Sequence, residues 1–271
     1  MRLIYPVQGP DLQLAPVATA GPLPAAVAEL AALYRNVADQ DSARHQQRRT
    51  WVRANMVASI DGAVTLGGRS GALSGLADRM IFGILRSLAD VILVGAGTAR
   101  AEHYRPVSAA SLWTALRPAQ APVPAIAVVT RSLDLDGCGQ LLTGAAEGAQ
   151  SIVITTQAAP ADRKAAIARH ARIIEAGEHR VDICAAVGAL ADLGHESILT
   201  EGGPTLLGHL ADAGLLDELC LTTSPLLAAG SAGRILASPN SVDTAAATVR
   251  LSLAHVLTDD SYLICRYLRE R

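Results

Sequence analysis

From residue 51 onward, short runs of β-branched and other apolar residues alternate with longer segments in which apolar residues recur at helical spacing. This alternation is typical of an α/β sheet whose strands are joined by helices. The predicted strands cover residues 51–59, 91–95, 125–130, 151–155, 172–175, 197–200 and 218–223, and the predicted helices between them cover 76–88, 161–170, 182–192 and 205–213.

The C-terminal region breaks this rhythm. Residues 248–256 and 261–269 form two adjacent strand patterns with only a short acidic turn between them. Two strands joined in this way predict an antiparallel hairpin. We therefore expect a mixed, mostly parallel central sheet that ends in this hairpin, which is a variant of the doubly wound order.

Residues 1–50 differ in composition from the rest of the chain. Five prolines lie within the first 24 residues, a helical pattern covers residues 25–37, and residues 41–49 are polar and rich in arginine. We interpret residues 1–50 as an N-terminal extension packed on the main domain, which spans residues 51–271.

Composition and charge argue against several kinds of partner. Aromatic residues make up 3% of the chain and the formal net charge is −2. The chain therefore offers little surface for stacking bases and no overall attraction for phosphate backbones or anionic membranes. It also has no secretory signal and no uninterrupted apolar stretch of about 18 residues. We expect a cytoplasmic protein with a small-molecule substrate and no nucleic-acid or membrane partner.

The motifs of several enzyme classes are missing. The four cysteines form no CxxC pair and the seven histidines form no evident ligand set, so we expect no metal. The sequence contains no G-x-S-x-G, no H-E-x-x-H, no Walker lysine loop and no zinc-deaminase signature. No motif identifies a catalytic residue.

Two glycine-bearing turns follow predicted strands. Gly95 ends the strand 91–95, and Gly97 and Thr98 follow it. Gly202, Gly203, Pro204, Thr205 and Leu206 follow the strand 197–200 and open a helix. Glycines let a ligand approach the backbone, and the free N–H groups of a helix start favour phosphate. Two such turns suit a dinucleotide, although ordinary strand-to-helix turns also use glycine for steric reasons.

Two further groups of residues are candidates for ligand binding. Arg131 and Ser132 follow the strand 125–130, and a guanidinium beside a hydroxyl suits a ribose 2′-phosphate, which predicts NADPH rather than NADH. A solvated surface arginine is the alternative. Asn55 and Ser59 are polar positions in an apolar strand, followed by Asp61 in an Asp-Gly turn. Since buried polar groups need partners, we count these three as candidate substrate contacts.

Several motifs together resemble the pyrimidine reductases of riboflavin biosynthesis. They are NMVASIDG at 55–62, RSG at 69–71, ADVILVGAGT at 89–98, TEGGPTLL at 200–207 and LDELCLTTSP at 216–225, and the resemblance covers about residues 51–269. It implies a three-layer fold like that of dihydrofolate reductase, NADPH as hydride donor, neither metal nor flavin, and a homodimer. Many bacterial members of this family carry a zinc deaminase domain that this sequence lacks, so we expect a stand-alone reductase.

The resemblance also implies roles for individual residues. The positions that match cofactor contacts of the family are Val57, Ala72, Thr98, Glu102, Ser132 and the turn at 203–206. The positions that match contacts with the pyrimidine and its ribosyl phosphate chain are Ser70, Arg86 and Glu201.

The sequence departs from the family pattern after Thr98. Tyr104 stands at the proline position of that pattern, and Ala109 replaces the arginine that the family uses for the substrate's phosphate. Arg105 can compensate for the missing guanidinium, while Tyr104 offers an aromatic edge to a pterin. We therefore expect weak or no activity on 5-amino-6-(5-phosphoribosylamino)uracil. Dihydrofolate or another pterin is the alternative substrate, and a nucleotide-binding protein without catalysis is a second alternative.

Overall fold

The structure is a computed structural model that describes residues 1–5, 23–35, 50–109, 114–117, 121–146, 148–237 and 248–270. Four of the five N-terminal prolines, the end of the predicted helix 25–37 and the arginine-rich residues 41–49 lie outside the described residues.

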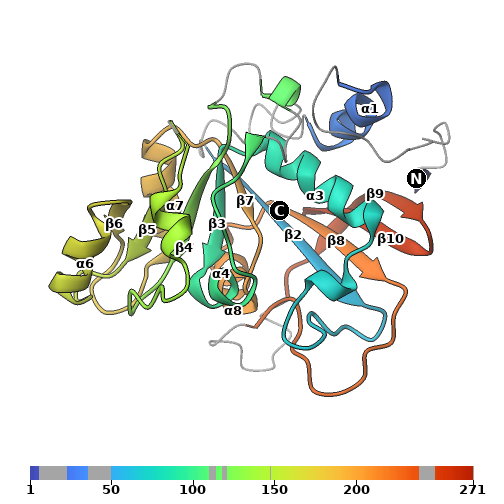
Figure 1. The fold of residues 1–271 in the computed structure, drawn as a ribbon. Helices are drawn as coiled ribbons and strands as arrows, with labels where there is room; N and C mark the ends of the chain where they lie inside the picture. The colour runs from blue at the N-terminus through green and yellow to red at the C-terminus, as the bar shows by residue number, and fades with distance from the viewer. Residues whose placement is uncertain are drawn as a thin grey trace.

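A single sheet of ten strands forms the centre of the described molecule (Figure 1). Its spatial order is β1-β9-β10-β8-β2-β7-β3-β4-β5-β6. The strands are β1 Arg2–Tyr5, β2 Trp51–Ser59, β3 Val91–Gly95, β4 Ala125–Val129, β5 Ile152–Thr155, β6 Arg172–Glu175, β7 Ser197–Thr200, β8 Glu218–Ser224, β9 Leu251–Asp259 and β10 Tyr262–Arg269. The seven strands from β8 to β6 are mutually parallel, and β1, β9 and β10 pair antiparallel, which confirms the predicted mixed α/β sheet.

Helices cover both faces of the sheet. They are α1 Ala25–Tyr34, α3 Leu76–Leu88, α4 Ala96–Ala101, α5 Gly139–Thr143, α6 Ala161–Ile167, α7 Ile183–Asp192 and α8 Pro204–Asp212, with short 3-10 turns η1 Gly71–Leu73 and η3 Thr114–Leu116. Ile92 and Leu199 are register partners on one face, where they pack with α1 and α3 through α6. The neighbouring residues Leu93 and Ile198 face the other way and pack with α7 and α8. The protein thus has three layers.

The C-terminal hairpin is tighter than the sequence pattern predicts. The predicted first strand begins at 248 and ends at 256, but β9 runs from Leu251 to Asp259 and leaves only Asp260 and Ser261 as the turn. Both turn residues have positive φ, 46° and 65°. A two-residue turn of this kind matches the right-handed twist of the strands, so the ladder continues right up to it.

The described parts of residues 1–50 join the main sheet and core. Strand β1 pairs with β9 at one end of the sheet, and Val27, Leu30 and Tyr34 of α1 are buried against α3. Sequence pattern does not reveal β1, because its four residues alternate too briefly to give a signal.

A buried charge cluster fixes the C-terminal end of α1. Glu218 is fully buried and accepts hydrogen bonds from Arg53, Arg266 and Trp51. The two guanidinium groups also donate to the last carbonyl groups of α1, Arg53 to Tyr34 O at 2.6 Å and Arg266 to Leu33 O. Burial disfavours the charge of Glu218, but attraction to Arg53 and Arg266 outweighs it and lowers the pKa of Glu218 to about 2.

Candidate active site

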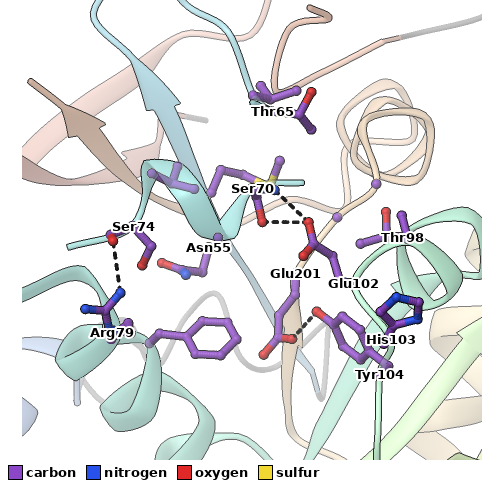
Figure 2. A pocket seen from close by; sticks show the side chains of 18 of the residues that line it. Asn55, Thr65, Ser70, Ser74, Arg79, Thr98, Glu102, His103, Tyr104 and Glu201 are labelled. Carbon is purple, nitrogen blue, oxygen red and sulfur yellow. Dashed lines mark hydrogen bonds between the residues drawn. The ribbon is translucent and has the colours of Figure 1, made fainter. Parts of the chain in front are cut away.

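A cavity of about 740 Å³ opens at the carboxyl ends of β2, β3 and β7 (Figure 2). This volume suits a cofactor with a small substrate, and the position is where α/β sheets bind ligands. Four groups of residues line it: Asn55, Met56 and Val57 of β2; Val64, Thr65, Gly68, Ser70, Gly71 and Ser74 of the next loop; Asp78, Arg79, Phe82 and Arg86 of α3; and Gly97, Thr98, residues 101–108 and residues 201–204.

The two predicted glycine turns form one side of the cavity. The Gly95 N–H donates to Gly202 O at 3.0 Å, which ties the turn before α4 to the turn before α8. A Cβ added at Gly203 would lie 2.6 Å from Thr98 Oγ1, so a larger residue there would have to displace the Thr98 hydroxyl. A Cβ added at Gly97 would meet no atom within 4 Å, which leaves open space above that backbone. The pair of turns therefore forms a cradle that a phosphate group can approach closely.

An ion pair with a tyrosine forms the inner wall. Arg86 donates to both carboxylate oxygens of Glu201, at 2.6 and 2.7 Å, and Tyr104 Oη donates to Glu201 Oε2 at 2.6 Å. The Arg86 guanidinium also lies 4.2 Å from the centre of the Phe82 ring. Burial disfavours the charge on Arg86, but Glu201 outweighs it and raises the pKa of Arg86; burial and then the Glu201 charge raise the pKa of Tyr104. Arg86 therefore stays charged and Tyr104 keeps its proton.

A second set of contacts closes the loop before α3 onto the end of α4. Glu102 Oε1 accepts from the backbone N–H of Ser70 at 2.7 Å and from its hydroxyl at 2.9 Å (Figure 2). Next to this pair, Arg69 Nη2 lies 2.7 Å from His103 Nε2. Ser70 and Glu102, for which the resemblance implies substrate and cofactor contacts respectively, thus meet directly at the cavity wall.

Sequence reasoning missed several polar residues of the cavity, Asp78 above all. Asp78 is only 6% exposed, and its Oδ2 accepts the hydroxyl of Ser74. Arg79 donates to Ser74 O at 3.0 Å. A signal was present in the sequence: Asp78, Phe82 and Arg86 are spaced four residues apart, so they lie on one stripe of an otherwise amphipathic helix.

The structure brings together most, but not all, of the predicted site residues. Those that line the cavity are Asn55, Val57, Ser70, Arg86, Gly97, Thr98, Glu102, Tyr104, Arg105, Glu201, Gly202, Gly203 and Pro204. Those that lie outside its lining are Ser59, Asp61, Ala72, Gly95, Arg131, Ser132, Thr205 and Leu206. Of these, Thr205 directly follows the lining residue Pro204, and the Gly95 N–H donates to the carbonyl oxygen of the lining residue Gly202.

Ser59 and Asp61 find their partners within the protein. Ser59 Oγ donates to Asp61 Oδ1 at 2.5 Å, and Asp61 also accepts the backbone N–H groups of Ala228 and Ala229. These hydrogen bonds, that of Ser59 first, lower the pKa of Asp61 to about 2. The pair therefore joins the end of β2 to the loop after β8, and the hydroxyl of Ser59 is satisfied without a ligand.

Arg131 and Ser132 are exposed just after β4, at the same edge of the sheet as the cavity. Arg163 Nη1 donates to Ser132 O at 3.3 Å. The guanidinium groups of Arg131 and Arg163 and the hydroxyl of Ser132 thus lie at the carboxyl end of β4.

Within the described residues, no group of three or more His, Cys, Asp or Glu side chains could hold a metal ion. No helix in the described part of the chain is long and apolar enough to cross a membrane.

The fold and the cavity define a class: an α/β protein with a small-molecule site at the carboxyl edge of a mixed sheet. A family model described as the RibD C-terminal domain matches residues 50–265, and the chain belongs to this family. A relative in Methanothermobacter thermautotrophicus, 2,5-diamino-6-ribosylamino-4(3H)-pyrimidinone 5′-phosphate reductase, is 28% identical over 221 residues, which cover 81% of this chain and 98% of the relative. The Archaeoglobus fulgidus protein of the same name is 28% identical over 185 residues, 67% of this chain and 83% of that one.

Solved structures share the fold. A pyrimidine reductase-like protein from Corynebacterium diphtheriae superposes with a TM-score of 0.72 at 25% identity, over 84% of this chain and 94% of that one. RibD from Acinetobacter baumannii has a TM-score of 0.63 at 18% identity, over 86% of this chain and 62% of that one, and shows the fold alone.

Proposed function

We propose that the protein is an NADPH-dependent reductase of a ribosylamino-pyrimidine 5′-phosphate. The observation that carries this proposal is one cavity in which a glycine cradle for a dinucleotide adjoins a polar pocket built by Asn55, Asp78, Arg86, Tyr104 and Glu201. Membership of the RibD C-terminal domain family and the names of the two archaeal relatives support the choice of substrate.

The cofactor half of the site comprises the two turns. The open space above Gly97 and the close approach of Gly203 to Thr98 fit a pyrophosphate laid against the backbone. Arg131 and Ser132, with Arg163 beside them, would hold the ribose 2′-phosphate that distinguishes NADPH from NADH. When bound, NADPH supplies a hydride.

The remaining residues bind and orient the substrate. Phe82 offers a flat face, while the Arg86–Glu201 ion pair and the Tyr104 hydroxyl present fixed dipoles to charge that develops in the reaction. Arg105 is exposed and lines the cavity, so it can take the terminal phosphate in place of the arginine that is missing at position 109. None of the four cysteines lines the cavity, so we expect no covalent intermediate on a thiol.

The test is the oxidation of NADPH by the purified protein with three substrates side by side: 2,5-diamino-6-ribosylamino-4(3H)-pyrimidinone 5′-phosphate, its uracil counterpart and dihydrofolate. Turnover of either ribosylamino-pyrimidine at kcat/KM above about 10⁴ M⁻¹s⁻¹ supports the proposal and shows that the loss at Ala109 is compensated. Turnover of dihydrofolate alone would establish the pterin alternative. Binding of NADPH without turnover of any substrate would favour the non-catalytic alternative.

By the same resemblance, we propose that the reductase works in the cytoplasm as a homodimer. Sedimentation velocity of the purified protein tests the dimer, and a single monomeric species at micromolar concentration would contradict it.

A further inference from the structure

Asp78 is a buried carboxylate with one oxygen left for a ligand. It stands in the first turn of α3, is 6% exposed and lines the cavity. Its Oδ2 accepts the Ser74 hydroxyl, and no residue in the described part of the chain donates a hydrogen bond to its Oδ1. A buried carboxylate needs donors, so this arrangement is suited to a ligand that brings N–H groups.

The other carboxylates of the cavity are differently engaged. Both oxygens of Glu201 are held by Arg86 and Tyr104, and Oε1 of Glu102 holds Ser70. Neither Arg86 nor Tyr104 donates to Asp78. Asp78 therefore accepts fewer hydrogen bonds from the described residues than Glu102 or Glu201, and it is buried whereas Glu102 is half-buried.

The two pyrimidines under consideration differ at the edge that a carboxylate would contact. A 2-amino-4(3H)-pyrimidinone presents its ring N3–H and its exocyclic NH₂ side by side, and both are donors. A uracil presents a carbonyl oxygen beside N3–H at the same edge. An ionised carboxylate accepts only, with about four lone-pair positions, so it pairs with both donors of the first ring even while Oδ2 keeps the Ser74 hydroxyl. Against uracil it would face the C2 carbonyl oxygen and repel it.

We propose that Asp78 determines substrate specificity by accepting hydrogen bonds from N3–H and the 2-amino group of the ring. The protein then selects the 2-amino-pyrimidinone, the form before deamination, over the uracil. This inference rests on the proposed function, since it concerns the substrate half of the same site.

The first measurement compares kcat/KM for the diamino-pyrimidinone and uracil substrates with NADPH. We expect the wild-type protein to favour the first by about 10- to 100-fold, because the uracil leaves a buried acceptor facing another acceptor. In Asp78→Asn the amide supplies one acceptor and one donor, which match N3–H and the C2 carbonyl of uracil. We expect this variant to lose the preference or to invert it.

A second measurement keeps the test independent of turnover. Isocytosine is the 2-amino-4(3H)-pyrimidinone ring alone, and its binding to the NADPH-loaded protein can be compared with that of uracil by NMR titration. Isocytosine should bind more tightly to the wild type, and Asp78→Asn should shift the ratio toward uracil. Asp162→Asn, an exposed carboxylate in the first turn of α6, is the matched control and should leave both ratios unchanged.

The outcomes separate the two proposals. If the wild type oxidises NADPH with neither substrate, the proposed function fails, and the isocytosine ratio still decides the role of Asp78. If the wild type turns over both substrates equally, or if a folded Asp78→Asn variant that binds NADPH keeps the wild-type preference, the role of Asp78 is overturned while the reductase function stands.

Discussion

The inner wall of the cavity depends on a single hydroxyl. Tyr104 donates to Glu201 Oε2 at 2.6 Å, while Arg86 holds both oxygens of the same carboxylate. Tyr104→Phe removes a hydrogen bond to a charged group, typically worth about 1.5–3 kcal/mol, and leaves the ring in place. We expect kcat/KM for the pyrimidine substrate to fall by about tenfold or more, with NADPH affinity nearly unchanged. An unaltered kcat/KM in steady-state kinetics would show that the hydroxyl has no part in the reaction.

Arg131 provides the test of cofactor choice. Its guanidinium is exposed at the carboxyl end of β4, beside Ser132. Arg131→Ala should weaken NADPH by roughly 1.5–3 kcal/mol and leave NADH nearly unchanged, because only NADPH carries the 2′-phosphate. Calorimetry with both nucleotides measures the two affinities. Equal affinity of the wild type for NADPH and NADH would rule out the assignment.

Among individual residues, the sequence pattern predicted many that line the cavity but not all of its polar groups. The turns at 95–98 and 201–206 were predictable, because glycines directly after an apolar strand indicate a place where another group approaches the backbone closely. Asp78 was not, since an acid in the first turn of a helix usually faces solvent and stabilises the helix dipole. Ser59, in contrast, was predicted as a ligand contact, but its hydroxyl bonds to Asp61 and Ala63 within the protein. These partners lie only a few residues away, yet the hydrogen bonds form only once the turn has folded.

At the scale of elements, α1 is held by charge as well as by apolar contacts. Arg266→Met would leave Glu218 with Arg53 as its remaining cationic partner among the described residues, and it would remove the side-chain donor to the Leu33 carbonyl. Removing one partner from a buried ion cluster is strongly destabilising, so we expect the free energy of unfolding to fall by about 3 kcal/mol. Denaturant unfolding followed by circular dichroism measures this.

The matched control for that change is Arg250→Met. Arg250 pairs with Glu270 at 2.7 Å, but its side chain is 84% exposed. Exposed pairs contribute about 0–1 kcal/mol, so this variant should unfold close to the wild type. If both variants lost a similar amount of unfolding free energy, the buried Glu218 cluster would contribute no more to stability than an exposed ion pair.

Elements with strong local patterns were predictable almost to the residue. Helix α3 and strands β2, β3, β6 and β7 have the predicted bounds, because their apolar periodicity is set by neighbours within the same segment. The hairpin turn and β1 were not predictable from local pattern, because both depend on pairing with strands outside their own segment. Strand β9 extends to Asp259 only because β10 continues the ladder beside it, and β1 exists because β9 offers an open edge.

At the scale of the whole molecule, stability should depend on pH through His255. This side chain is 4% exposed and packs edge-on against Tyr34, and burial, followed by the charge of Arg266, lowers its pKa from 6.5 to about 4. The unfolded chain, with the ordinary pKa, takes up the proton first as pH falls. The stabilisation is therefore complete above pH 6.5 and is lost as pH falls toward 4.

A shift of this size corresponds to about 3 kcal/mol lost over that range. Free energies of unfolding measured at several pH values between neutrality and about pH 4 test the expectation, and His255→Gln should flatten the curve there. A wild-type free energy of unfolding that does not change between neutral pH and about pH 4 would contradict this expectation.

The two ends of the sheet avoid intermolecular pairing in different ways. At one end, β6 is four residues long and begins and ends with the charged residues Arg172 and Glu175, which discourages another strand from adding to it. At the other end, β1 pairs with Val256, Leu257 and Thr258 of the nine-residue β9. A shortened protein without residues 1–5 would lose this pairing and, as far as the described residues go, would leave the whole outer edge of β9 open, which is a template for aggregation. The first five residues thus act as a solubility device, and any trimmed version for crystallisation would need a charge introduced on β9.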